Sequence, residues 1–306
     1  MCQLPKVSVL IPTYNSAGYL DETIKSVLGQ TFTDFELLIV DNCSTDDTKS
    51  VVAKYLHDHR IHYILNEQNI GMCGNWNRSL SYAKGKYIKY LMSDDKFHLQ
   101  LLEKFVAVME EFPSVSLVSS YKTIFGTENW NFKSPLSGLQ PGLEAIEHSV
   151  LTHNWIGEPT TVMFRKESAR VGSFKSDLHY YMDFDLWLRI LKTGDLYVVP
   201  EYLSSFRVHS AQATEGIKQS HVDSFEPYYY LNFLYDFNFA GFVNELPFKL
   251  AKQRAAQKCV NLIPSLRTAN NVALLERARE IGRRENVKPP TVLDRAVSKL
   301  KRYVSK

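Results

Sequence analysis

Two adjacent aspartates, Asp94 and Asp95, follow an apolar run of strand character in the segment YIKYLMSDDKF, residues 87–97. Two carboxylates side by side repel each other and need a counter-charge. Hard oxygen ligands of this kind suit Mg²⁺ or Mn²⁺, and substrate phosphates commonly complete the coordination shell of these ions. The pair therefore predicts a divalent ion that carries a diphosphate.

Two further polar clusters also follow predicted strands. PTYN, residues 12–15, comes directly after VSVLI, and DNCSTDD, residues 41–47, comes directly after FELLIV. Helix caps and turns commonly contain aspartate, and that explanation suffices for Asp46 and Asp47 taken alone. Open α/β sheets, however, bind ligands beyond the carboxyl ends of their strands. Three polar clusters at such ends therefore indicate one binding crevice.

The elements that must position these clusters are apolar runs alternating with segments of helical period. Leu20, Ile24 and Val27 share one helical face, and Ser44 has the spacing of a capping box with Asp47 before the next helix. Strands and helices repeated at this spacing indicate right-handed crossovers and a mostly parallel sheet. The sequence predicts strands at 7–11, 35–40, 61–65, 86–91, 115–120 and 160–164, and helices at 20–28, 75–83 and 101–112.

Length and composition fit a globular protein, because 306 residues that are 44% hydrophobic can bury a large core. A net charge of +3 is too small to indicate nucleic-acid binding, so no such partner is expected. The four cysteines are scattered, which favours a reducing compartment, and without a leader or a spanning apolar stretch we expect a cytoplasmic protein. Neither GxGxxG nor GxxxxGK[ST] is present, which argues against Rossmann dehydrogenases and P-loop enzymes.

A longer series of motifs, in a fixed order, resembles the family 2 glycosyltransferases, which are inverting nucleotide-sugar enzymes. The motifs are VSVLIPTYN, ETIKSVLGQTF, FELLIVDNCSTDDT, NIGMCGNWNRSLSYAKGKYIKYLMSDD, DFDLWLRI and FRVH. The resemblance implies an α/β fold of GT-A type, with a mostly parallel nucleotide-binding sheet flanked by helices and a C-terminal helical extension. The implied domains are a catalytic domain at 1–215, with a nucleotide-binding half at 1–120 and an acceptor-binding half at 121–215, and a helical region at 216–306.

The resemblance also implies donor-side roles. The PTYN residues would lie against the nucleotide base, and Asp41 would accept a hydrogen bond from the base edge, which suits uracil and makes a UDP-sugar the favoured donor. The implied nucleotide-binding residues are Pro12, Thr13, Tyr14, Asp41, Asn69, Asn77 and Asp94. Asp95 and His209 correspond to metal ligands for Mn²⁺ or Mg²⁺. Many family members have an aspartate where this chain has Met92, which puts the ribose contact in doubt.

The catalytic base implied by the resemblance is Asp183, in HYYMDFDLWLRI, with Asp185 in reserve. Met182 stands where the family motif has a glutamate. Inverting transfer needs one base within hydrogen-bond reach of the acceptor hydroxyl, while a metal stabilises the departing diphosphate. Carboxylates in the first turn of a helix are also favoured by the helix dipole alone, which is the structural explanation for both aspartates.

The acceptor side is indicated by NWIGEPTTVMF, where Trp155 could offer a flat face to a sugar ring and Glu158 a hydrogen-bond acceptor. Residues 121–153 contain many turn formers and read as irregular. The expected acceptor is a glycan or lipid-linked sugar, and the expected activity is of hexosyl or N-acetylhexosaminyl type. The basic segment at 291–306 leaves open a peripheral contact with the inner face of the membrane, and a homo-oligomer also stays open.

Two other functions remain open at this stage. The first is a non-catalytic nucleotide-sugar binding or scaffolding protein of the same fold, which the departures at Met92 and Met182 keep in view. The second is a nucleotidyltransferase that makes the sugar nucleotide, but its glycine- and lysine-rich signature near the N-terminus is missing. An active transferase is favoured by the retained Asp41, Asp95, Asp183 and His209.

Overall fold

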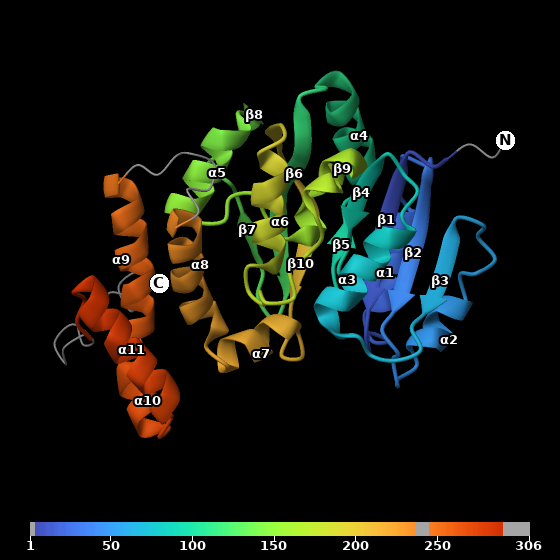
Figure 1. Cartoon of the computed structure of the whole chain (residues 1–306). Helices are drawn as coiled ribbons and strands as arrows, with labels where there is room; N and C mark the ends of the chain where they lie inside the picture. Colours follow the sequence, from blue (N-terminus) through green and yellow to red (C-terminus); the bar gives the residue numbers. More distant parts are fainter. Residues whose placement is uncertain (1–3, 237–244, 290–306) are drawn as a thin grey trace. The chain divides into compact units, whose positions relative to one another are not determined.

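The computed structural model describes residues 4–236 and 245–289. The chain divides into two compact units, Met1–Gln212 and Ala213–Lys306, and Figure 1 follows the chain through both. This boundary lies close to the predicted one at 215. The units are described separately below.

The first unit is built on one sheet. In its described residues ten strands pair in the order β3-β2-β1-β4-β9-β6-β10-β5, with β7 on β6 and β8 on β10. The strands are β1 (Val7–Thr13), β2 (Phe35–Asp41), β3 (Ile61–Leu65), β4 (Tyr87–Tyr90), β5 (Lys96–Phe97), β6 (Val115–Gly126), β7 (Trp130–Phe132), β8 (Gly138–Gln140), β9 (Met163–Arg165) and β10 (Asp195–Val208).

Strand direction explains where polar side chains gather. β3, β2, β1 and β4 are parallel neighbours, and β6 runs parallel to β10. The short β9 is antiparallel to both β4 and β6, so it joins the two parallel groups without reversing them. The long strands therefore point the same way, and their carboxyl ends share one edge of the sheet. The predicted parallel character is confirmed for this framework, with antiparallel β5, β7, β8 and β9 added.

Helices cover this sheet because their apolar stripes match its faces (Figure 1). Leu20, Ile24 and Val27 of the first helix are completely buried in one core with β1 and β2, as their helical spacing predicts. The helices of this unit are α1 (Leu20–Leu28), α2 (Thr48–Ala53), α3 (Gly71–Tyr82), α4 (Leu101–Glu111), α5 (Gly142–Leu151) and α6 (Met182–Leu191), with 3₁₀ turns η1 (Pro159–Thr161) and η2 (Lys166–Val171).

Two local predictions are wrong. Ser44 does not cap α2, since that helix begins only at Thr48 and its Asp47 cap makes no side-chain bond. The Ser44 hydroxyl instead accepts a hydrogen bond from the Asn15 amide at 2.8 Å, which ties the two polar loops together. Residues 121–153 are not irregular, because β6 continues to Gly126 and is followed by β7, β8 and α5.

The second unit contains the predicted C-terminal helices. In the described residues these are α7 (Ala213–Gln219), α8 (Val222–Asp236), α9 (Glu245–Asn261), α10 (Ile263–Thr268) and α11 (Val272–Glu285). Small buried side chains on α9, including Ala256 and Cys259, allow α8 and α11 to pack closely against it. The predicted basic helix at 291–306 lies outside the described residues. None of the described helices is both long and apolar enough to cross a bilayer.

Candidate active site

The donor-side edge begins where β1 and β2 end next to each other. Thr13 and Asp41 are paired across these strands, and both are buried. Asp41 accepts a hydrogen bond from the Ser44 amide at 2.8 Å and another from the Tyr63 hydroxyl at 2.6 Å. Burial and the bond to Asp41 raise the pKa of Tyr63. The Asp41 carboxylate is therefore fixed in place at the strand end.

Two neighbours of Asp41 still offer groups for a ligand. The Thr13 hydroxyl is buried without a hydrogen-bond partner among the described residues, and such a group usually implies a missing partner. Tyr14, the next residue, is 48% exposed although it is a large aromatic residue. Pro12 is buried within β1. An orphan hydroxyl beside an exposed aromatic ring is a fitting place for a planar polar group.

The two asparagines predicted to line the base pocket form hydrogen bonds within the protein. The Asn69 carbonyl accepts hydrogen bonds from the Asn42 amide and the Gly71 N–H, each at 2.9 Å, which orders the loop before α3. The side-chain amide of Asn77 donates a hydrogen bond to the Phe174 carbonyl and accepts one from the Phe174 N–H, each at 2.9 Å. Both ends of the Asn77 amide therefore hold the loop at Phe174, and its role in nucleotide binding stays a prediction.

Asp94 and Asp95 have opposite environments although they are adjacent. The side chain of Asp94 is 24% exposed, and its Oδ2 lies 2.9 Å from Nε2 of His209. Asp95 is only 1% exposed. Its Oδ1 accepts from the Arg207 N–H at 2.8 Å, and its Oδ2 accepts from the Thr160 hydroxyl at 2.5 Å. Burial, together with the neighbouring Asp94 charge, raises the pKa of Asp95 well above its usual range.

Asp94 is better placed than Asp95 to meet a metal ion. Asp95 is buried and each of its oxygens already accepts a hydrogen bond from the protein, so its assignment as a metal ligand stays a prediction. Asp94 and His209 supply one hard oxygen and one imidazole nitrogen, a donor set that suits Mn²⁺ or Mg²⁺ when a substrate adds further oxygens. No group of three or more acidic, His or Cys residues that could hold an ion alone occurs in the described parts of the chain.

Arg207 and Tyr19 support the Asp94 and His209 pair. Arg207 lies between the Tyr19 and Phe125 rings, with its guanidinium carbon 4.9 and 4.3 Å from their centroids. It also donates to the Asp94 carbonyl at 2.7 Å. The Tyr19 ring lies 4.5 Å from the His209 ring. These contacts fix the end of β10, and therefore the imidazole, beside the end of β4.

The acceptor side is gathered around η1. Lys122 of β6 forms an ion pair with both oxygens of Glu158, the residue before η1. Although burial acts to raise it, the pKa of Glu158 is lowered, because the Lys122 charge favours the carboxylate. Gly157 holds φ at +116°, and a Cβ there would lie 2.7 Å from the Thr161 hydroxyl. Only glycine fits this turn, which directs Glu158 toward Lys122.

The two candidate bases on α6 are clearly different. Asp185 is buried and paired with Lys175 at 3.1 Å and with Arg189 at 2.8 Å. These ion pairs favour a structural role, and its assignment as reserve base stays a prediction. Asp183 accepts a hydrogen bond only from the Phe184 N–H among the bonds found for its side chain. Burial raises the pKa of Asp183 to about 7, and the Glu158 charge adds to this. Such a carboxylate is a usable base at neutral pH.

Trp155 belongs to an aromatic cluster. Its ring stacks on Phe132 at 5.9 Å and meets His153 edge-on at 4.8 Å, while its indole N–H donates to Thr152 at 2.7 Å. The ring is only partly covered. The structure therefore leaves Trp155 available as one part of an aromatic surface on the side of β7.

Lys89, in the middle of β4, was not expected to contribute. It is completely buried, and its ammonium group donates to the carbonyls of Tyr90, Pro159 and Thr160. Burial lowers its pKa well below the usual range. Lys89 thus attaches η1 to the donor-side strand. The only sequence signal is a lysine inside an apolar strand, which reads equally well as a surface position.

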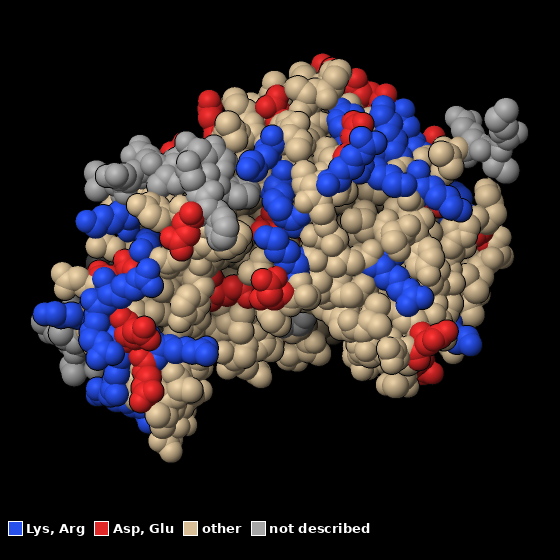
Figure 2. All heavy atoms as spheres, in the orientation of Figure 1, with Lys and Arg blue, Asp and Glu red and all other residues tan. Residues whose placement is uncertain are grey.

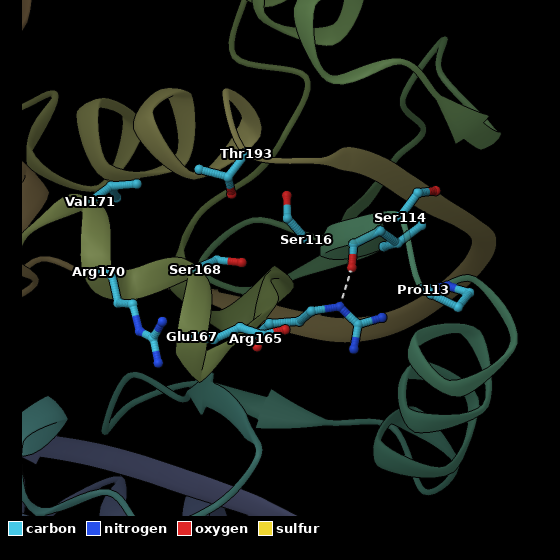
Figure 3. Close-up of a pocket in the computed structure, with 10 residues that line it drawn as sticks. Pro113, Ser114, Ser116, Arg165, Glu167, Ser168, Arg170, Val171 and Thr193 are labelled. Carbon is cyan, nitrogen blue, oxygen red and sulfur yellow. Dashed lines mark hydrogen bonds between the residues drawn. The ribbon is translucent and has the colours of Figure 1, made fainter.

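A pocket of about 430 Å³ lies at the other edge of the sheet, where β6 begins and β9 ends (Figure 3). Arg165 lies along its floor and donates to the carbonyls of Val115, Met109 and Phe112 at 2.6 to 3.0 Å. Through these hydrogen bonds, the Arg165 guanidinium connects β9 to the start of β6 and to the end of α4. The pocket contains none of the predicted site residues.

Comparison with known proteins identifies the family to which the chain is similar. The model of the family described as Glycosyl transferase family 2 matches residues 8–172. The putative teichuronic acid biosynthesis glycosyltransferase TuaG of Bacillus subtilis is 32% identical over 209 residues, which cover 67% of this chain and 79% of TuaG. A Campylobacter jejuni GalNAc(5)-diNAcBac-PP-undecaprenol beta-1,3-glucosyltransferase is 30% identical over 203 residues, 64% of this chain and 62% of its own length.

The structure of S. aureus TarS 1–349 in complex with UDP-GlcNAc is similar over 92% of both chains, with a TM-score of 0.61 and 19% identity. At this identity the likeness speaks for the fold, which is the GT-A fold expected from the motifs. The order of motifs, the sheet and the family match agree, and the chain belongs to glycosyl transferase family 2.

Proposed function

We propose that this glycosyltransferase moves a sugar from a nucleoside diphosphate sugar, with a UDP-sugar favoured, to a hydroxyl of a glycan or lipid-linked acceptor, with inversion at the anomeric carbon. The observation that carries the proposal is that the turn at η1 contacts both sides of the site. The Thr160 hydroxyl donates to Asp95 at 2.5 Å, and the Gly157 carbonyl accepts from the indole N–H of Trp187, one helical turn after Asp183 on α6, at 3.2 Å. The donor-side carboxylates and the candidate base therefore share one neighbourhood.

The donor nucleotide is assigned to the ends of β1 and β2. The unpaired Thr13 hydroxyl and the exposed Tyr14 ring support this assignment, and Asp41 is held rigidly next to them. An aromatic face and fixed acceptors suit a uracil base. The UDP-GlcNAc complex of TarS shows that a UDP-sugar binds a protein of this fold.

Asp94 and His209 would hold a divalent ion together with the donor diphosphate. When bound, the ion would neutralise the charge that develops on the leaving diphosphate. In the present arrangement the His209 Nδ1 accepts from the Ala211 N–H at 3.3 Å, so its Nε2 carries the proton toward Asp94. Binding a cation through Nε2 would need the other tautomer, with the proton on Nδ1, so the contact from the Ala211 N–H would be lost.

Asp183 is assigned as the base. It would accept the proton of the acceptor hydroxyl while the acceptor oxygen forms a bond to the anomeric carbon and the bond from that carbon to the diphosphate breaks. One displacement of this kind inverts the configuration. With a pKa of about 7, Asp183 is substantially ionised at neutral pH and is also basic enough to assist the transfer.

Glu158 and Trp155 are assigned to the acceptor. Glu158 is kept anionic by Lys122 and can accept hydrogen bonds from sugar hydroxyls, and Trp155 offers part of an aromatic face. The printed names of the relatives, one in teichuronic acid synthesis and one acting on an undecaprenol-linked glycan, support a carbohydrate or lipid-linked carbohydrate acceptor.

The competing possibility is a nucleotide-sugar binding protein without catalysis. It is favoured by Met182, which occupies the place of the motif glutamate and is buried in α6. The two functions differ in turnover and not in donor binding, because both need the donor-side edge.

Calorimetric titration with UDP, GDP and dTDP, with and without Mn²⁺, tests the donor assignment on the parent chain and on Asp94→Ala. We expect UDP to bind more tightly with Mn²⁺ and the variant to lose that difference. Hydrolysis of a UDP-sugar, followed by NMR of the released sugar, tests turnover and inversion. Metal-dependent binding without any turnover would instead support the binding protein, and binding of no nucleotide would contradict both.

A further inference from the structure

Charge is divided unevenly between the two units. The small net charge hides 16 Lys and Arg against 9 Asp and Glu in residues 213–306, and 20 against 24 in residues 1–212. The first unit is therefore net negative by four charges, and the second is net positive by seven. A net positive charge on the second unit, with a net negative charge on the first, indicates an anionic partner for the second unit.

The described residues of the second unit, 213–236 and 245–289, carry 11 Lys and Arg against 8 Asp and Glu. Figure 2 shows Lys and Arg gathered over the helices at the C-terminal end of the described chain. We use the term basic face for the exposed cations of α9 to α11 and the residues that follow, which are Lys249, Arg254, Lys258, Arg267, Arg277, Arg279, Arg283, Arg284 and Lys288. The exposed acids Glu276 and Glu280 offset only part of their charge.

Large apolar side chains are also exposed on this unit. Tyr229 and Phe233 are one helical turn apart on α8, and they are 48% and 38% exposed. Leu250 of α9 is 50% exposed, and Val272 at the start of α11 is 56% exposed. Isolated exposed residues of this kind are ordinary, but several on one small helical unit are not.

Tyr229 connects the aromatic residues with the basic face. Burial of part of the ring raises the pKa of Tyr229. The preceding residue, Tyr228, donates a hydrogen bond to Glu285 of α11 at 2.8 Å, so this turn of α8 lies next to the end of α11 that carries Arg283 and Arg284. Aromatic rings next to exposed Lys and Arg are the composition that prefers the interface between lipid headgroups and acyl chains.

We propose that the basic face, together with Tyr229 and Phe233, binds a membrane surface that contains anionic phospholipid. Nucleic acid would also attract the cations, but it would not account for the exposed aliphatic Leu250 and Val272. The proposal does not depend on the transferase reaction. If the acceptor is lipid-linked, such binding would bring the chain to the surface where that acceptor lies.

Cosedimentation of the full chain with vesicles tests this proposal. Vesicles of phosphatidylcholine alone are compared with vesicles that also contain phosphatidylglycerol, at low and at raised salt. We expect binding only to the anionic vesicles, weakened by salt because surface charges are screened.

The charge variant is Arg277→Glu with Arg284→Glu, and its matched control is Lys49→Glu with Lys54→Glu, two exposed cations of the first unit. The charge variant should bind anionic vesicles at least about tenfold more weakly, while the control should change by less than about twofold. A second variant, Tyr229→Ser with Phe233→Ser, should lose the part of the vesicle binding that the parent chain retains at raised salt.

Three results would overturn the proposal: no vesicle binding by the parent chain, equal binding of the charge variant and the control, or equal binding to neutral and anionic vesicles. Binding to single-stranded DNA in preference to anionic vesicles would assign the basic face to nucleic acid instead. UDP binding, measured on the same variants, is expected to be unchanged, so failure here is distinguishable from failure of the donor assignment.

Discussion

The donor side and the acceptor side of the site are built in different ways. Donor-side groups lie at or just beyond the ends of neighbouring parallel strands, since Asp41 ends β2 and Asp94 follows the end of β4 by four residues. The acceptor side joins Lys122, Glu158 and Asp183, which come from a strand, a turn and a helix far apart in the sequence. Its geometry depends on an ion pair and on buried side-chain contacts.

The difference teaches which parts of the site tolerate change. A strand end keeps its position when one side chain is replaced, because the hydrogen-bonded ladder remains. A turn held by Lys89 and Thr160 loses its position when either side chain is removed. Replacing a donor-side side chain such as Asp94 should therefore leave stability unchanged, whereas substitutions around η1 should also change stability.

The largest effect is expected on the acceptor side, from Asp183→Asn. Removing the base should slow transfer by about 10³-fold, with UDP binding unchanged. Steady-state rates and calorimetry on the same preparation measure both quantities. Asp185→Asn is a poor mimic, since it should lose stability through its ion pairs with Lys175 and Arg189. A rate within tenfold of the parent would contradict Asp183 as the base.

A somewhat smaller effect is expected on the donor side, from Asp94→Asn. Transfer should fall by about 10²-fold and the Mn²⁺ concentration needed for half-maximal activity should rise, while the melting temperature stays the same. Asp95→Asn provides the contrast. Because Asp95 accepts from Thr160 and the Arg207 backbone, that variant should melt earlier. The comparison between the two sides is wrong if Asp95→Asn alters only metal dependence.

Replacing Lys89 tests the coupling of η1 to β4. Lys89→Met leaves three carbonyls without their donor, so the free energy of unfolding should fall by about 1–3 kcal/mol. The KM for the acceptor should rise more than the KM for the donor, because η1 directly follows Glu158, which is proposed to bind the acceptor. Lys84→Met, at an exposed position, is the control. Urea unfolding and two-substrate kinetics measure these changes, and equal effects on both KM values would argue against the coupling.

The smallest effect is a change of stability with pH at Asp183. Its pKa in the folded chain, about 7, lies above the ordinary value of 3.8, so folding favours the protonated form. The stability it contributes is complete below about pH 4 and is lost as the pH rises through 7. Asp183→Asn should therefore be more stable than the parent at pH 8. We expect a difference of about 1–2 kcal/mol, which is smaller than the pKa difference alone implies because solvent screens a partly exposed carboxyl group. At pH 4 the difference in urea midpoints should vanish.

The sequence predicted the strand framework and the placing of Asp41 and Asp94 because apolar periodicity reports which backbone segments are buried. It did not predict that Asp95 turns inward while Asp94 faces outward, since adjacent identical residues carry no signal for that choice. Asn77 resembled a ligand residue, but its partner is the backbone of Phe174, nearly a hundred residues away. Lys89 and Lys122 were missed because their partners are tertiary contacts.

The position of β9 has a consequence for how the chain is made. This three-residue strand lies between β4 and β6, although it follows them in the sequence by about 75 and 40 residues. In a growing chain the strands from β1 through β4 can pair with one another early. β6 cannot be added to them until residue 165 has been synthesised, because β9 lies between β4 and β6. Until then, one side of β4 is an open strand edge that can pair wrongly with another chain. The nascent protein is therefore expected to be most prone to aggregation during that interval.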